Sequence, residues 1–118
     1  MNRFRFEDLE IWQEAIEITT LLFRIADKLE AKKLWRFADQ VRGVALSIPN
    51  NISESTGTEM LGEQTQLLRY SRRECYEAAN LVVILASEKH ITYTEKEKLY
   101  ERLHVLSKRI TSYSRSLK

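Results

Sequence analysis

Apolar residues recur at intervals of three and four along most of the chain, which is the spacing of a helix that buries one face. The first such stripe consists of Leu9, Trp12, Ile16, Thr19, Phe23 and Ala26, widened by Ile11, Ala15 and Leu22. It predicts a helix over residues 8–30. After a short link at 30–33, a second stripe predicts a helix over 34–52, and it consists of Leu34, Ala38, Val41, Ala45, Ile48 and Ile52.

The only proline of the chain, Pro49, lies inside this second stripe. Pro49 has no N–H for the carbonyl of Ala45, and its ring pushes against that carbonyl, at a cost of about 3 kcal/mol in an ordinary helix interior. Because Ile52 keeps the phase of Ala45 and Ile48, we expect one kinked helix rather than a break.

Polar side chains surround the proline, and they can satisfy the loosened backbone groups or meet a bound partner. They are Ser47, Asn50, Asn51 and Ser53, of which Asn50 and Asn51 are candidates for an oligomer contact at the kink. In the alternative interpretation, Asn51 caps a separate short helix and Glu54 completes a capping box.

Two further segments predict helices. One runs from near Thr58 or Glu59 to about Glu88. Thr94 and Glu97 have the spacing of a capping box and predict the start of the last helix. Its apolar seam is almost a pure heptad repeat of Leu99, Leu103, Leu106, Ile110, Tyr113 and Leu117. Four helices with short links predict an all-α fold, an antiparallel up-down four-helix bundle with a proline-kinked second helix, in a single domain over residues 1–118.

Composition agrees with a helical intracellular protein. The 118 residues include only three glycines and one proline, which argues against a turn-rich sheet protein. Cys75 is the sole cysteine, so no internal disulfide is possible, and the longest apolar run, at 81–86, is too short to cross a bilayer. We therefore expect a protein of the reducing cytoplasm, without a signal peptide or membrane contact.

The basic residues are the strongest functional signal. The formal net charge is only +2, yet residues 102–118 carry five bases and no acid. Arginine binds phosphate oxygens through paired hydrogen bonds, and tyrosines such as Tyr70 and Tyr76 can stack on unpaired bases. The residues predicted to bind nucleic acid are Arg42, Arg69, Arg72, Arg73, Lys108, Arg109 and Arg115. In the alternative, the arginines form surface ion pairs with Glu74, Glu77, Asp39 and Glu54, and the basic C-terminal end complements the helix dipole.

Signals of catalysis are weak. Pairs with the spacing of metal-binding residues are Glu101–His104, Glu14–Glu17 and Glu74–Glu77. The first is a single copy of a motif that di-metal bundles need twice. Surface ion pairing is the better account of the two glutamate pairs. Since a Gly-rich phosphate loop is also missing from the sequence, we expect a protein that is not an enzyme and has no metal or cofactor.

Three stretches resemble a known family, namely "FEDLEIWQEA" at 6–15, "DQVRGVALSIPNNISE" at 39–54 and "SRRECYEAANLVVILA" at 71–86. They are similar to the four-helix bundle family of 23S rRNA intervening sequence proteins, which includes the accessory variability proteins of diversity-generating retroelements. The run from Ser47 to Glu54 around Pro49 is the most specific part. The chain departs from the family pattern at Ser55 and Thr58, which lose a glycine and a basic residue, and at Arg73 and Glu74, which replace a small pair.

The resemblance implies a bacterial, non-enzymatic protein that assembles into a five-fold ring. The retroelement members bind nucleic acid and a reverse transcriptase through a basic surface. By this resemblance we expect a homo-oligomer, a pentamer, that binds RNA or DNA, and five copies would carry a formal charge of about +10 and add their phosphate contacts by avidity. The alternative is a protein–protein scaffold ring that docks a partner such as a reverse transcriptase.

Overall fold

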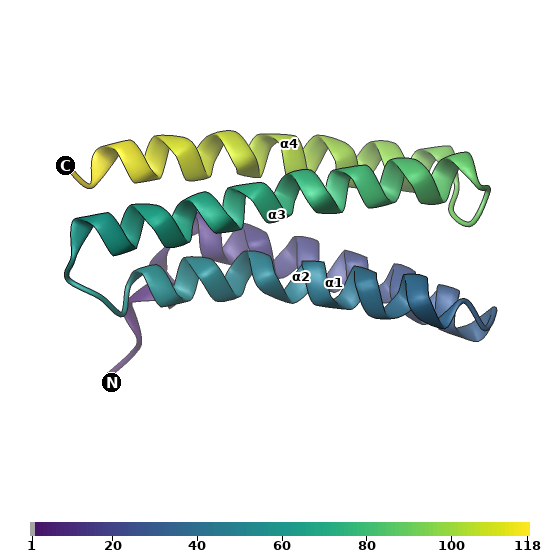
Figure 1. Cartoon of the computed structure of the whole chain (residues 1–118), viewed down its shortest axis with the longest axis horizontal. Helices are drawn as coiled ribbons and strands as arrows, with labels where there is room; N and C mark the ends of the chain where they lie inside the picture. Colours follow the sequence, from purple (N-terminus) through teal and green to yellow (C-terminus); the bar gives the residue numbers. More distant parts are fainter. Residues whose placement is uncertain (1) are drawn as a thin grey trace.

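The computed structural model describes residues 2–118 and contains, over that range, helices and no strand. A short 3-10 helix, η1 (Arg5–Asp8), precedes four α-helices, which are α1 (Glu10–Ala31), α2 (Trp35–Ser55), α3 (Leu61–Ser87) and α4 (Tyr93–Ser116). The all-α class and the four predicted helices are therefore confirmed. The helices lie side by side, with the turns after α1 and α3 at one end of the molecule and the turn after α2 at the other end (Figure 1). Within the described range, no helix has an apolar stretch long enough to cross a membrane.

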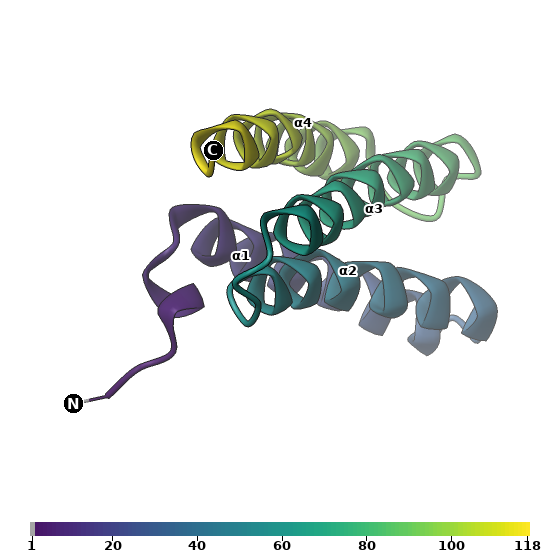
Figure 2. The ribbon, with the colours of Figure 1, turned by 60° about the vertical axis from the view of Figure 1, so that its left-hand side comes forward.

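Each helix packs on the next in sequence, whereas α1 and α4 touch less extensively. Figure 2 shows α4 on the side of α3 that faces away from α2. One buried cluster draws side chains from all four α-helices. Its largest fully buried members are Ile18, Leu22, Leu29, Val41, Ile48, Ile52, Leu68, Val82, Leu85, Leu103, Leu106 and Ile110. Each such burial contributes about 1.5–3 kcal/mol to stability.

The buried face of α1 differs from the predicted stripe. Ile16 was expected on the core side but is 37% exposed, while Ile18, which lies outside the predicted stripe, is fully buried. Ala15 and Ala26 are also fully buried, as are Ala38 and Ala45 on α2. We attribute the shift to these small residues, because they let the two helices approach closely along the line that contains them.

The start of α4 was predicted two residues too late. Thr92, not Thr94, is the cap, because its Oγ1 accepts a hydrogen bond from the Glu95 N–H at 3.0 Å while Glu95 Oε1 accepts from the Thr92 N–H at 2.9 Å. Both candidate pairs have the same sequence spacing. The earlier one is used because Ile91 is buried just before it and Lys28 of α1 pairs with Glu95 at 2.8 Å.

The start of α3 was predicted too early. Thr58 lies in the non-helical link, where its Oγ1 accepts a hydrogen bond from the Met60 N–H at 3.2 Å. The Gln64 side chain donates to the Thr58 carbonyl at 2.8 Å. These bonds occupy Thr58 outside the helix, so α3 begins at Leu61.

Helix α2 continues through Pro49 to Ser55, so the predicted continuity is confirmed and the alternative with a new helix at Asn51 is wrong. Asn51 belongs to the same helix and donates from its side chain to the Ser47 carbonyl at 2.8 Å. Asn50 is exposed.

The carbonyl that Pro49 leaves without a partner finds one on another helix. The hydroxyl of Thr19 on α1 lies 3.0 Å from the Ala45 carbonyl, and also 2.8 Å from the carbonyl of Ala15 in its own helix. One proton is therefore shared between two buried acceptors. On the other side of α2, the Ser71 hydroxyl of α3 donates to the Ile48 carbonyl at 2.8 Å. Two buried hydroxyls thus bind the backbone around the proline, and the sequence prediction missed both.

Candidate nucleic-acid interface

The seven predicted basic residues do not form one surface. Arg42 lies at the contact between α2 and α1, where its Nη2 is 2.9 Å from Asp27 Oδ1 and its Nη1 is 3.0 Å from Glu30 Oε1. The hydrogen bonds to Asp27 and then Glu30 raise the pKa of Arg42 above its usual value. With its side chain only 28% exposed, Arg42 joins two helices and is engaged within the chain.

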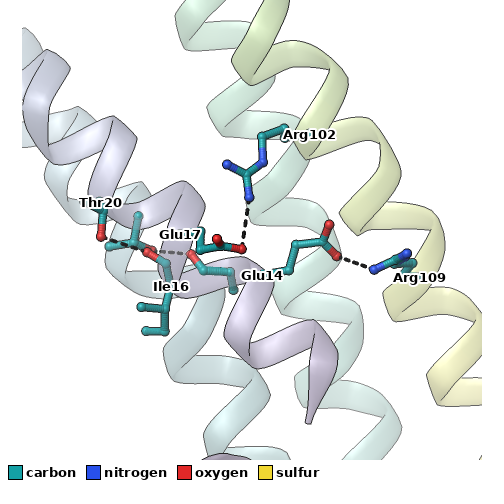
Figure 3. A network of polar contacts seen from close by, with 8 residues as sticks. Glu14, Ile16, Glu17, Thr20, Arg102 and Arg109 are labelled. Atoms are coloured by element: carbon teal, nitrogen blue, oxygen red, sulfur yellow. Dashed lines mark hydrogen bonds and ion pairs between the residues drawn. The ribbon is translucent and has the colours of Figure 1, made fainter.

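Arg109 lies at the contact between α4 and α1. Its Nη1 is 2.9 Å from Glu14 Oε2. About one turn away on α1 and about two turns away on α4, Arg102 Nη2 is 3.2 Å from Glu17 Oε2 (Figure 3). The prediction that Glu14 and Glu17 form surface ion pairs is confirmed. Together with the pair between Lys28 and Glu95, these ion pairs bridge α1 and α4, whose contact is less extensive than those between successive α-helices.

Three other arginines line a common hollow of about 140 Å³ between α3 and α4, which we call the arginine hollow. Its lining consists of Thr65, Leu68, Arg69 and Arg72 of α3 and of Ile110, Thr111, Ser114 and Arg115 of α4. Among the ion pairs formed within residues 2–118, none involves Arg69, Arg72 or Arg115. Arg69 donates to the side-chain oxygen of Gln66 at 2.8 Å, which leaves its charge unneutralised.

The helix geometry explains why these side chains gather. Arg69 and Arg72 are three residues apart on α3, and Thr111 and Arg115 are four apart on α4, so each pair shares one side of its helix. Leu68 and Ile110 are buried beneath the hollow and hold the two helices together. Three guanidinium groups with no acidic partner can bind an anion with several oxygens, such as a phosphate, through charge-assisted hydrogen bonds.

Arg73 lies apart from the arginine hollow, in a polar hollow of about 440 Å³ that also includes Asn51, Tyr70, Glu74 and Glu77. Burial is the main cause that raises the pKa of Glu74 to about 7, and the hydrogen bond and charge of Glu77 add to it. These two glutamates were expected to form surface ion pairs. That expectation is wrong, because over residues 2–118 neither carboxyl group forms an ion pair, and Glu74 is half-enclosed beside Glu77.

The alternative pairing of the arginines also differs from prediction. Over residues 2–118, no ion pair involves Asp39, Glu54, Glu74 or Glu77. Arg42, Arg102 and Arg109 instead pair with acids of α1. Lys108 is exposed on α4.

A second hollow of about 460 Å³ lies between the same two helices, and we call it the tyrosine groove. Its lining consists of Cys75, Tyr76, Ala79, Asn80 and Val83 of α3 and of Tyr100, Leu103, His104 and Ser107 of α4. The Arg72 guanidinium lies over the Tyr76 ring, 5.7 Å from its centroid, so the two hollows adjoin at this pair. Burial, followed by the charge of Glu74, raises the pKa of the Cys75 thiol to about 12, which keeps it neutral. The sequence prediction missed Tyr100 and considered His104 only for its metal-type spacing from Glu101, because the heptad seam marks only the buried side of α4.

Comparison with known proteins identifies the fold family. The family model for the 23S rRNA-intervening sequence protein matches residues 7–112. The chain belongs to this family. No curated protein matches the chain. In this 23S rRNA-intervening sequence family member, the matched range includes Pro49, Thr19, Arg69 and Arg72, while Arg115 lies beyond it.

Proposed function

We propose that this member of the 23S rRNA-intervening sequence family is a non-catalytic protein that binds nucleic acid through the arginine hollow. The observation that carries the proposal is the convergence of Arg69, Arg72 and Arg115, without acidic partners, on one hollow between two helices. Like charges held close together repel each other, and a phosphate group between them removes the repulsion. Lys108, exposed three residues before Thr111 on α4, extends the binding surface in this proposal, whereas Arg73 lies in the separate polar hollow.

We further propose an antiparallel bundle, bent at Pro49, that assembles into a homo-oligomer in the bacterial cytoplasm, with a pentamer implied by the family resemblance. Several copies of a three-arginine site would bind one polyanion with added strength. Asn50, which is exposed beside the bend, is the candidate for a contact between copies. We expect Pro49→Ala to change the mass of the assembly measured by light scattering. An unchanged mass would contradict a contact between copies at this position.

The experiment for nucleic-acid binding is fluorescence anisotropy with labelled RNA and DNA at low salt and across a salt series. We expect the double variant Arg72→Glu/Arg115→Glu to lose at least about tenfold in affinity and about one to two units of the slope of log affinity against log salt. Arg24→Glu/Arg36→Glu, at exposed positions of α1 and α2 away from the hollow, makes the same change in net charge and is the matched control. No binding by the unmodified protein at low salt, or an equal loss in the control, would refute the proposal.

Exposed apolar side chains favour the second candidate function, a scaffold that docks a protein partner such as a reverse transcriptase. Leu46 on α2 and Ile84 on α3 both present apolar surface to solvent. In that case the Arg72→Glu/Arg115→Glu variant keeps the partner while it loses nucleic acid. A substitution such as Leu46→Glu would then release the partner and leave nucleic-acid binding in place.

A further inference from the structure

The tyrosine groove offers what a phosphate site alone does not, namely aromatic faces beside polar groups. Tyr76 and Tyr100 come from opposite walls and are 60% and 45% exposed, so both rings present much of their surface to solvent. Asn80 and His104 also line the groove, where their side chains can donate and accept hydrogen bonds. The volume, about 460 Å³, falls within the range of small-ligand sites.

The groove and the arginine hollow are neighbours on the same pair of helices. Arg72 lines the hollow and lies over the ring of Tyr76, which lines the groove. These residues are separated by one turn of α3, a rise of about 5.4 Å. A ligand with a phosphate at one end and a flat ring at the other therefore meets both sites at once.

We infer that the tyrosine groove receives an unpaired base of a single-stranded nucleic acid whose adjacent phosphate lies in the arginine hollow. The inference rests on the proposed function and adds a preference for strands with accessible bases. Bases inside a duplex are stacked on their neighbours and present only their edges, so they cannot enter a groove between two tyrosines. Since stacking uses the π-face common to all bases, the groove accepts both RNA and DNA with little regard to sequence.

The three arginines of the arginine hollow favour a nucleotide over an apolar ligand. A hydrophobic peptide side chain could fill the space beside Val83 but would leave the three arginines without a partner. A nucleotide satisfies both parts, because its base covers the rings and its phosphate neutralises the cations.

The test compares two oligonucleotides of equal length and charge, one of thymidines and one of abasic sites, with an oligouridylate as the RNA arm. Anisotropy at fixed salt should give the thymidine and uridine strands at least about fivefold higher affinity than the abasic strand, from base stacking. In Tyr100→Leu this ratio should fall to about one, and Tyr100→Phe, which keeps the ring, should restore it. Tyr93→Leu is the matched control, because Tyr93 contacts Lys96 as Tyr100 does but lies outside the groove.

Each outcome bears on a separate part of the argument. Equal affinity of the base-bearing and abasic strands overturns the base pocket while leaving phosphate binding intact. Failure of every strand to bind at low salt overturns both the inference and the proposed function. If Tyr100→Leu lowers the mass seen in light scattering, the groove is covered by a second copy of the chain, and the inference is wrong.

Discussion

The hydrogen bond between Thr19 and Ala45 leads to a specific prediction about Pro49. Thr19 and Ala45 are buried, and their hydrogen bond of 3.0 Å replaces the one that Pro49 is unable to make. In Thr19→Val the shape of the side chain is kept, but the Ala45 carbonyl loses its partner. A buried acceptor without a partner costs about 1–3 kcal/mol, so Thr19→Val should lower the free energy of unfolding by about that amount.

Thr19→Val should lower the free energy of unfolding by less when residue 49 has a backbone N–H to donate. In Pro49→Ala the new N–H can reach the Ala45 carbonyl and restore the helical hydrogen bond. Thr19→Val on that background then removes only a bond within α1, to the Ala15 carbonyl. We therefore expect a coupling of about 1–2 kcal/mol between the two positions in a double-mutant cycle.

Urea unfolding of the four proteins, followed by circular dichroism at one protein concentration, measures this coupling. Thr20→Val is the matched control, because Thr20 makes a comparable bond to the Ile16 carbonyl on the exposed side of α1. Thr20→Val should lower the free energy of unfolding by less than about 0.5 kcal/mol, with either Pro or Ala at position 49. If Thr19→Val is equally costly with Pro49 and with Ala at position 49, the hydroxyl does not compensate for the proline.

Three other predictions concern pH, helix ends and the thiol. Folding raises the pKa of Glu74 from 4.5 to about 7, so its stabilising contribution below about pH 4.5 is lost as pH rises to about 7. The free energy of unfolding of Glu74→Gln should then exceed that of wild type by about 1–2 kcal/mol at about pH 8, allowing for solvent screening, and should not exceed it at about pH 4. A pH-independent difference in urea unfolding would contradict this. Lys33 has a φ of 64°, in the left-handed region that glycine adopts at lower cost than other residues. Lys33→Gly should therefore raise the free energy of unfolding by up to about 1 kcal/mol, as measured by thermal unfolding. The neutral Cys75 thiol should react with a disulfide reagent far more slowly in native than in urea-unfolded protein, and equal rates would refute its burial.

The number of helices and the continuity of α2 were predictable because both depend on a period along the chain. A stripe that keeps phase from Val41 to Ile52 is incompatible with a change of direction at Pro49. The start of α4 was less certain, because Thr92–Glu95 and Thr94–Glu97 satisfy the same local rule. The choice between them depends on Lys28, which is distant in sequence, so a local pattern could not make it.

The candidate site was predictable only in part. Arg69 and Arg72 were identified, since they are close together in one helix. Arg115 lies beside them only because of the orientation of α4 about its long axis, and the same orientation places Arg109 next to α1. A heptad seam marks which side of α4 is buried but not which neighbour lies on either flank, so the two arginines could not be told apart from sequence.

The division of charge between the two sides of α4 is what gives a nearly neutral chain a basic site. On the side that faces α1, Arg102 and Arg109 meet glutamates, and each ion pair is electrically neutral at a distance (Figure 3). On the side that faces α3, Arg115 meets two more arginines. A net charge of +2 therefore understates the local field, because the acids that balance the total lie elsewhere. The double substitution Arg115→Glu/Glu14→Arg would leave the net charge unchanged, break the ion pair between Arg109 and Glu14 and place an acid in the arginine hollow. Loss of nucleic-acid binding in this variant would show that the local cluster, and not the net charge, attracts the ligand.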